Sequence, residues 1–235
     1  YGGGEGVDEL STVHKFALDG AVPTYVASGV VKGRVLNQFS MDEKDGYLRI
    51  ATTTGHLPSD SVHSTLSVLG VVEDDLATVG QIDGIAPSED IRSVRFDGTR
   101  AFIVPFKKTD PLFVFDLSDP LAPTKMGELK IPGFSTYMHM MDASHLLTIG
   151  YDAEDEGDFA WFSGVLIQVF DVTEPANPTR QHAHEIGTRG SSSEALTNHL
   201  AFNYFDPLHL LALPMTVCEG GSGGSYGTEM TFNGL

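Results

Sequence analysis

The chain has 235 residues, of which 41% are hydrophobic, and this is enough apolar sequence for a packed core. No run approaches the roughly 20 apolar residues of a membrane-spanning helix, so we expect no membrane span. Fourteen basic against 32 acidic residues give a net charge of −18, which repels phosphate backbones and argues against nucleic acid as a partner. The single cysteine, Cys218, excludes a disulfide within the chain.

A phrase of three parts recurs along the chain, and its parts keep the same order. The first part runs from an apolar stretch through an acidic residue into a Pro-Thr step, which predicts a strand that stops at a rigid turn. It occurs as FALDGAVPT at 16–24, FDLSDPLAPT at 115–124 and FDVTEPANPT at 170–179. The second part is a glycine-bounded segment: GVVKG at 29–33, GELKIPG at 127–133, a weaker HEIGT at 184–188, and GQID at 80–83 in a copy without the Pro-Thr step.

The third part is an aspartate-marked turn that leads into an apolar strand: DGYLRIAT at 45–52, DGTRAFIVPF at 97–106, DASHLLTIG at 142–150 and DPLHLLALP at 206–214. The four marker aspartates are 52, 45 and 64 residues apart, close to the ~40–50 residues of a propeller blade. No sustained helical stripe of apolar residues accompanies the strand-like runs. We therefore predict an all-β protein, a β-propeller with about four blade-like units that belongs to a larger propeller, over the alternative of a β-sandwich.

The third unit serves as a sketch of one blade. We expect MGELKIPG at 126–133 to be its outer strand, STYMHMM at 135–141 and HLLTIGY at 145–151 to form a hairpin around Asp142, and VLIQVFDV at 165–172 to be its last strand. Alternation in equivalent strands predicts that four side chains are buried between adjacent sheets: Leu147, Ile149, Leu211 and Leu213. The longest loops are expected at 152–164 and 181–197, and binding sites are often built on such loops.

Four long stretches resemble a known group of proteins: residues 37–55, 91–106, 110–139 and 164–179. They are similar to bacterial secreted proteins that carry a C-terminal β-propeller distantly related to WD40 repeats, and the resemblance covers about residues 11–235. It implies the propeller fold and a secreted or extracellular, cell-surface location, and it implies no reaction and no catalytic residues. We accordingly divide the chain into a flexible N-terminal segment, 1–10, and a propeller domain, 11–235, that is incomplete at both ends.

An acidic run between two strands is the first candidate site. It holds five carboxylates in seven residues: Asp152, Glu154, Asp155, Glu156 and Asp158. Oxygen-rich loops of this kind suit Ca²⁺, which takes 6–8 oxygen ligands, so calcium is the predicted cofactor. The run does not follow the EF-hand spacing. The alternative is a solvated acidic loop in a very acidic protein.

His182 and His184 are the second candidate, because side chains at i and i+2 of a strand lie on one face, as in a pair of zinc or copper ligands. Glu185 is adjacent and His199 could supply a third ligand from the next strand. The alternative is a pair of histidines on an exposed segment.

Nucleophilic catalysis finds little support in the sequence. The chain has no G-x-S-x-G motif, and Ser191, Ser192 and Ser193 before Glu194 are typical of the cap of a helical turn. We therefore expect a non-catalytic propeller at the cell surface that acts as an interaction or structural module. Its partner would be a protein, a glycan, or remaining propeller blades from the same or another chain. The alternative is a metal-dependent hydrolase or lactonase with its ion at the mouth of the propeller channel.

Overall fold

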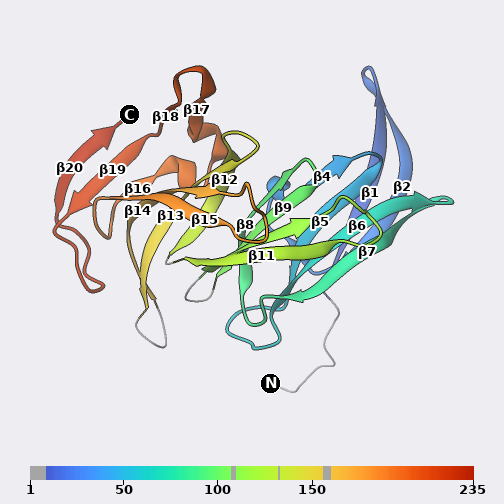
Figure 1. Cartoon of the computed structure of the whole chain (residues 1–235), viewed down its shortest axis with the longest axis horizontal. Coiled ribbons are helices and arrows are strands. Elements are labelled where there is room, and N and C mark those ends of the chain that lie inside the picture. Colours follow the sequence, from blue (N-terminus) through green and yellow to red (C-terminus); the bar gives the residue numbers. More distant parts are fainter. Residues whose placement is uncertain (1–8, 107–109, 132, 156–159) are drawn as a thin grey trace. The chain divides into compact units, whose positions relative to one another are not determined.

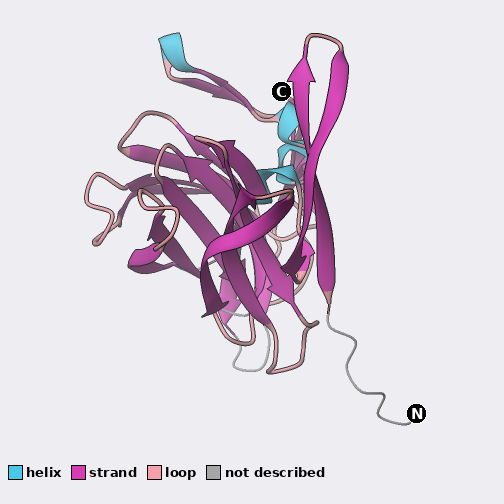
Figure 2. Cartoon of the chain, turned by 90° about the vertical axis from the view of Figure 1, so that its right-hand side faces the viewer, coloured by secondary structure: helices cyan, strands magenta, loops and turns pink. Residues whose placement is uncertain are grey.

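The computed structural model describes residues 9–106, 110–131, 133–155 and 160–235. Strands make up almost all of its regular structure, with short 3-10 turns between some of them (Figure 2). Residues 1–8 of the N-terminal segment lie outside the described part, and the first strand begins at Leu10. Within the described ranges, no helix has the length and apolar character needed to cross a membrane.

The chain divides into two compact units. The first comprises residues 1–91, 96–101 and 115–125, and the second comprises residues 92–95, 102–114 and 126–235.

The first unit contains a long hairpin and an antiparallel sheet (Figure 1). The hairpin consists of β1 (Leu10–Asp19) and β2 (Val22–Lys32). The sheet has the order β3 (Arg34–Val35), β5 (Tyr47–Thr54), β6 (His63–Val72) and β7 (Asp75–Ile85), with β4 (Met41–Lys44) also paired to β5. Asp45 and Gly46 have φ values of 54° and 88°, which suit the tight turn between β4 and β5. The first marker aspartate therefore marks a hairpin turn, as predicted.

Arg49 of β5 fastens this unit together. It is 3% exposed, and its guanidinium donates to both carboxylate oxygens of Asp42 on β4 and to the carbonyl oxygen of Gly98, the last at 2.6 Å. The same guanidinium lies 5.2 Å from the ring centre of Phe96. Because these partners use the donors of the buried cation on several sides, the turn at 97–98 is fixed against β4 and β5.

Two four-stranded antiparallel sheets follow along the chain. One has the order β8 (Asp90–Asp97), β9 (Arg100–Phe106), β10 (Asp110–Asp116) and β11 (Thr124–Ile131), and its strands contribute to both units. The other belongs to the second unit and has the order β12 (Phe134–Met140), β13 (His145–Asp155), β14 (Ala160–Asp171) and β15 (Thr179–Ile186). These two sheets are blade-like units of the predicted kind.

The predicted division between blades was wrong by one strand. The segment 126–133 was expected to open the third blade, but β11 pairs with β10 and closes the second. The cause is the Pro-Thr phrase before it, in which Asp119 accepts a hydrogen bond from Leu121 and folds the chain back on itself. The same reversal after β14 makes β15 the outer strand, so 165–172 is not the last strand of its sheet.

Most of the first segment expected to be a long loop is strand, whereas the second, 181–197, is strand only at 181–186 and 192–193. β13 extends to Asp155 and β14 begins at Ala160, so most of 152–164 is a lengthened hairpin. Residues 181–186 lie in β15. The sequence pattern missed this because charged and polar residues populate exposed strands where no apolar alternation is needed.

The fourth sequence repeat, marked by Asp206, is less regular than predicted. Its described strands form the sheet β16 (Ser192–Ser193), β19 (Met215–Glu219) and β20 (Glu229–Gly234), and the small hairpin β17 (Asn203–Phe205) with β18 (Leu210–Ala212). Three 3-10 turns precede or interrupt these strands: η2 (Glu194–Leu196), η3 (His199–Ala201) and η4 (Asp206–Leu208). The predicted strand 206–214 is therefore only partly strand, because Pro207 favours a turn at its start.

The predicted core residues lie in the second unit. Ile149, Leu147 and Leu213 are buried, with exposed fractions of 0%, 4% and 8%, and all three join one apolar cluster. Leu211 is only partly buried, although it packs against the same cluster. The cluster joins β13 and β14 to η2 and β19, and it therefore holds the fourth repeat against the sheet β12–β15.

We expect Ile149→Ala to lower the free energy of unfolding by ~2–5 kcal/mol, because it removes a fully buried side chain from this cluster. Leu208→Ala, at a side chain that is 69% exposed in the same unit, should change it by less than about 0.5 kcal/mol. Denaturant unfolding of both variants measures the difference. Equal small losses would show that the cluster is not a packed core.

Asp83 on β7 joins three strands of the first unit. Its carboxylate accepts hydrogen bonds from Lys32 of β2 at 2.8 Å, from Thr65 of β6 at 2.7 Å and from the N–H of Gly84 at 2.9 Å. Burial by itself raises the pKa of this carboxyl, but the bonds outweigh that effect and lower the pKa from 3.8 to about 2. The folded state therefore holds the proton less tightly than the unfolded state does.

A lowered pKa means that Asp83 contributes stability above pH 3.8, and that this contribution disappears as the pH falls to about 2. We expect Asp83→Asn to cost about 1 kcal/mol or less at neutral pH, since the side chain is half-exposed and screened by solvent. The difference from the unchanged protein should shrink between those two pH values. A constant difference from pH 7 to pH 2 would contradict the role of Asp83.

Candidate functional site

The predicted calcium ligands fall at the hairpin between β13 and β14. Asp152 is partly buried on β13. Glu154 and Asp155 lie on the same strand, where their backbones pair with Trp161 and Ala160. The side chains of these two residues, and Glu156 and Asp158 altogether, lie outside the described part of the structure. Calcium binding by the run therefore stays a prediction.

His182 and His184 lie on β15, opposite Val169 and Ile167 of β14. Both are exposed, and their spacing along the strand puts them on one face, as expected. His199, the suggested third ligand, lies on the turn η3. Among the described residues, no three or more His, Cys, Asp or Glu side chains gather as a metal site. A metal at these histidines stays a prediction without a third ligand.

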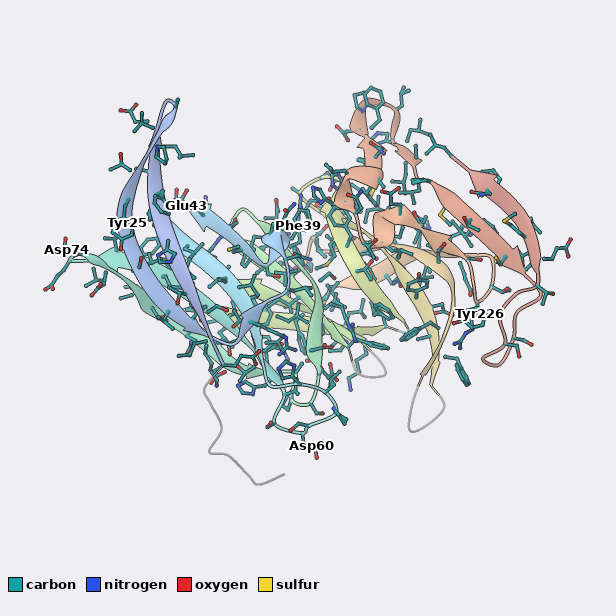
Figure 3. The ribbon with its side chains drawn as sticks, turned by 180° about the vertical axis from the view of Figure 1, so that it is seen from behind. Tyr25, Phe39, Glu43, Asp60, Asp74 and Tyr226 are labelled. Atoms are coloured by element: carbon teal, nitrogen blue, oxygen red, sulfur yellow. The ribbon has the colours of Figure 1, made fainter. Side chains whose placement is uncertain are left out.

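A different feature of the second unit was not predicted from the sequence. It is a pocket of about 320 Å³, here called the Arg189 pocket, to which β13, β14, the turn after β15 and the segment before β20 contribute. It is lined by Tyr151, Phe162, Ser163, Arg189, Gly190, Ser191, Ser192 and Tyr226. Figure 3 shows Tyr226 on the segment that leads into β20.

The turn after β15 is fixed by a hydrogen-bond network with β19. The N–H of Thr188 donates to the carbonyl oxygen of Cys218 at 2.7 Å, and the N–H of Cys218 donates to Ser191 Oγ at 2.9 Å. Gly187 allows this approach, because it has a φ of 65° and a Cβ there would lie 2.2 Å from Ser191 Oγ. The backbone on either side of Arg189 is therefore held in one conformation.

Arg189 makes cation–π contacts with two aromatic rings. Its guanidinium carbon lies 4.5 Å from the ring centre of Trp161 and 4.6 Å from that of Tyr226. The N–H of Gly227 donates to the carbonyl oxygen of Arg189 at 2.7 Å, which keeps Tyr226 beside it. Gly224 lies against Trp161, and a Cβ there would lie 2.5 Å from the ring. These contacts thus join three separate segments of the chain.

The ring contacts leave the hydrogen-bond donors of Arg189 for other partners. The rings use the faces of the guanidinium, whereas its N–H groups lie in its plane. Nη1 of Arg189 is buried and has no hydrogen-bond partner among the described residues. A buried cationic donor without an acceptor is costly, so this atom points to an acceptor from outside the pocket wall.

The inner wall of the pocket is aromatic. The ring centre of Phe162 lies 5.0 Å from that of Phe134 and 6.3 Å from that of Tyr151, and Phe106 extends the cluster. Burial raises the pKa of Tyr151, so its hydroxyl stays neutral and can donate a hydrogen bond at neutral pH. A second hollow of about 120 Å³ shares the side chains of Phe162, Ser163 and Arg189 with the pocket.

The described lining of the pocket combines aromatic rings, hydroxyls and one guanidinium. The described lining residues include neither a carboxylate nor an imidazole, the usual proton carriers. Ser191 Oγ donates to the carbonyl oxygen of Cys218 and accepts from its N–H, so it is held by the backbone. Apolar walls with a few placed polar groups are typical of ligand sites.

The sequence held little signal for this pocket. The serine run beside Arg189 was interpreted as a helical-turn cap, which is confirmed, because Ser193 Oγ accepts from the N–H of Ala195 at the start of η2. Trp161, Arg189 and Tyr226 are far apart along the chain and form no motif. Only the fact that Trp161 is the one tryptophan of the chain could have drawn attention to it.

Comparison with known proteins agrees with the all-β architecture of the chain. The sequence matches the family model described as a beta propeller domain over residues 4–235. An uncharacterised protein of Archaeoglobus fulgidus is 42% identical over 172 residues, which are 73% of this chain and 25% of that protein. One of Methanocaldococcus jannaschii, also uncharacterised, is 37% identical over 190 residues, or 80% of this chain and 28% of that protein.

These two relatives are archaeal and considerably longer, and the chain spans about a quarter of their length. The bacterial, secreted and C-terminal features that the sequence resemblance implied stay predictions. The fold prediction itself is confirmed by the family match and by the antiparallel sheets. The chain belongs to the beta propeller domain family.

Proposed function

We propose that this part of the propeller is a non-catalytic binding module, and that it receives a small polar ligand or the exposed group of a larger partner in the Arg189 pocket. The observation that carries the proposal is Arg189, which contacts two aromatic rings and whose buried Nη1 has no partner among the described residues. The pocket volume of about 320 Å³ lies at the lower end of the range for small-ligand sites.

The wider setting of this module is also a proposal. We infer an exported protein at the cell surface from the resemblance, with a protein or glycan as the partner. The relatives are about four times as long as the matched segment, so further blades from the same or another chain are equally part of this proposal. The described residues give no support to the alternative of a metal-dependent hydrolase.

Trp161 provides a direct test, because it is the one tryptophan of the chain and contacts Arg189. We expect its fluorescence to change when a panel of sugars, oligosaccharides and short peptides includes a ligand of the pocket. Ser192→Phe should remove that response by filling the pocket, and Ser192→Ala should keep it. Calorimetry on the same variants measures the affinity.

Thermal unfolding should first show that Ser192→Phe and Ser192→Ala are folded. The binding proposal is wrong if no member of the panel gives a response in the unchanged protein that Ser192→Phe removes.

The acidic run 152–158 remains a separate proposal, as a calcium site. Its clustered carboxylates repel one another, and a divalent ion relieves this repulsion, so millimolar calcium should raise the midpoint of thermal unfolding. Sodium at the same ionic strength should not reproduce the shift, and Asp152→Asn with Glu154→Gln should reduce it. An unchanged midpoint in calcium would leave the run as a solvated acidic segment.

A further inference from the structure

We propose that the Arg189 pocket recognises a carboxylated sugar, with the guanidinium of Arg189 binding the carboxylate and the aromatic wall receiving the sugar ring. This inference rests on the proposed function, and it adds the chemical class of the ligand.

The geometry of the ring contacts carries the first step. The guanidinium carbon of Arg189 lies 4.5 Å from the ring centre of Trp161 and 4.6 Å from that of Tyr226, so the two rings restrict its rotation and leave its N–H donors, the buried Nη1 among them, for an acceptor. A planar fork of donors matches the two oxygens of a carboxylate, which can accept two parallel hydrogen bonds. The rings thus orient Arg189 for a planar anion before any ligand arrives.

The charge of the protein carries the second step. The chain has a net charge of −18, which disfavours anions at long range, and this repulsion grows with the charge of the ligand. A carboxylate carries one negative charge, whereas a phosphate monoester carries nearly two at neutral pH. One arginine in an acidic protein therefore favours the singly charged group.

The remaining lining carries the third step. Tyr226 is 65% exposed, which leaves ring surface for the C–H face of a sugar, and Phe162 offers a second apolar wall. Ser163 supplies a hydroxyl of the kind that hydrogen-bonds sugar hydroxyls. A pocket of about 320 Å³ has the size of a small-ligand site and not of an interface with a folded partner, so an acidic sugar unit is a ligand that fits.

The test compares three ligands that share one ring: glucuronate, its uncharged amide glucuronamide, and glucose. Calorimetry and Trp161 fluorescence should show that glucuronate binds at least ~10-fold more tightly than either neutral ligand, since a charge-assisted pair is lost in them. Arg189→Gln should remove this preference, and Arg189→Lys should keep only part of it, because lysine cannot present two parallel donors. Arg180→Gln is the matched control, since Arg180 lies on β15 and donates to Gln168 outside the pocket.

Circular dichroism and thermal unfolding should show that each Arg189 variant is folded, and the comparison of ligands on the unchanged protein needs no variant at all. Equal affinity for the three ligands, removed by Ser192→Phe, would overturn the carboxylate and leave the binding module intact. A preference for triglycine over its C-terminal amide, with no binding of glucuronate, would show a peptide carboxylate as the ligand and overturn the sugar. If no ligand of either kind, and none of the wider panel, gives a response that Ser192→Phe removes, the proposed function fails together with this inference.

Discussion

The apolar cluster between the sheet β12–β15 and the fourth sequence repeat is the interaction on which the described site depends. Ile149 and Leu147 of β13 pack in one cluster with Leu196 of η2. Leu213, which precedes β19, and Met215, which begins it, belong to the same cluster. Burial of these side chains supplies the main driving force that brings the fourth repeat onto the sheet. The turn after β15 and the segment before β20 are attached to the same elements, so their positions follow from this packing.

The pocket adds specific polar interactions to that apolar frame. The bonds between Thr188, Ser191 and Cys218 fix the turn, and the contact of Gly227 with Arg189 fixes the facing tyrosine. Several glycines are needed because the backbone approaches other groups too closely for a side chain, as Gly224 shows against the ring of Trp161. A preformed site of this kind loses little conformational entropy when a ligand binds.

The sequence predicted the fold because the repeat reflects a physical requirement of each sheet. The Asp45–Gly46 pair predicts a hairpin turn, and the Pro-Thr phrases mark the points at which the chain reverses. The division into blades was wrong because the repeat gives the order of the strands and not the pairing between them. Pairing depends on which neighbour each Pro-Thr turn brings alongside, and β11 returns to β10.

The site could not be predicted in the same way. We selected carboxylates and histidines in the sequence because they are common metal ligands. In the structure, the pair His182 and His184 is exposed on β15. The Arg189 pocket combines residues from separate segments, and no local pattern encodes the contacts of Arg189 with Trp161 and Tyr226. Such a site depends on tertiary packing and becomes visible only when the segments are in place.

The central claim is that the Arg189 pocket is preformed on the packed core of the second unit. Amide hydrogen exchange tests it directly, because the N–H groups of Thr188, Cys218 and Gly227 make the hydrogen bonds that build the pocket. We predict that these three amides are protected without any ligand, with opening free energies close to those of β13. Exchange of the three at the rate of an unstructured chain, while β13 stays protected, would contradict the account.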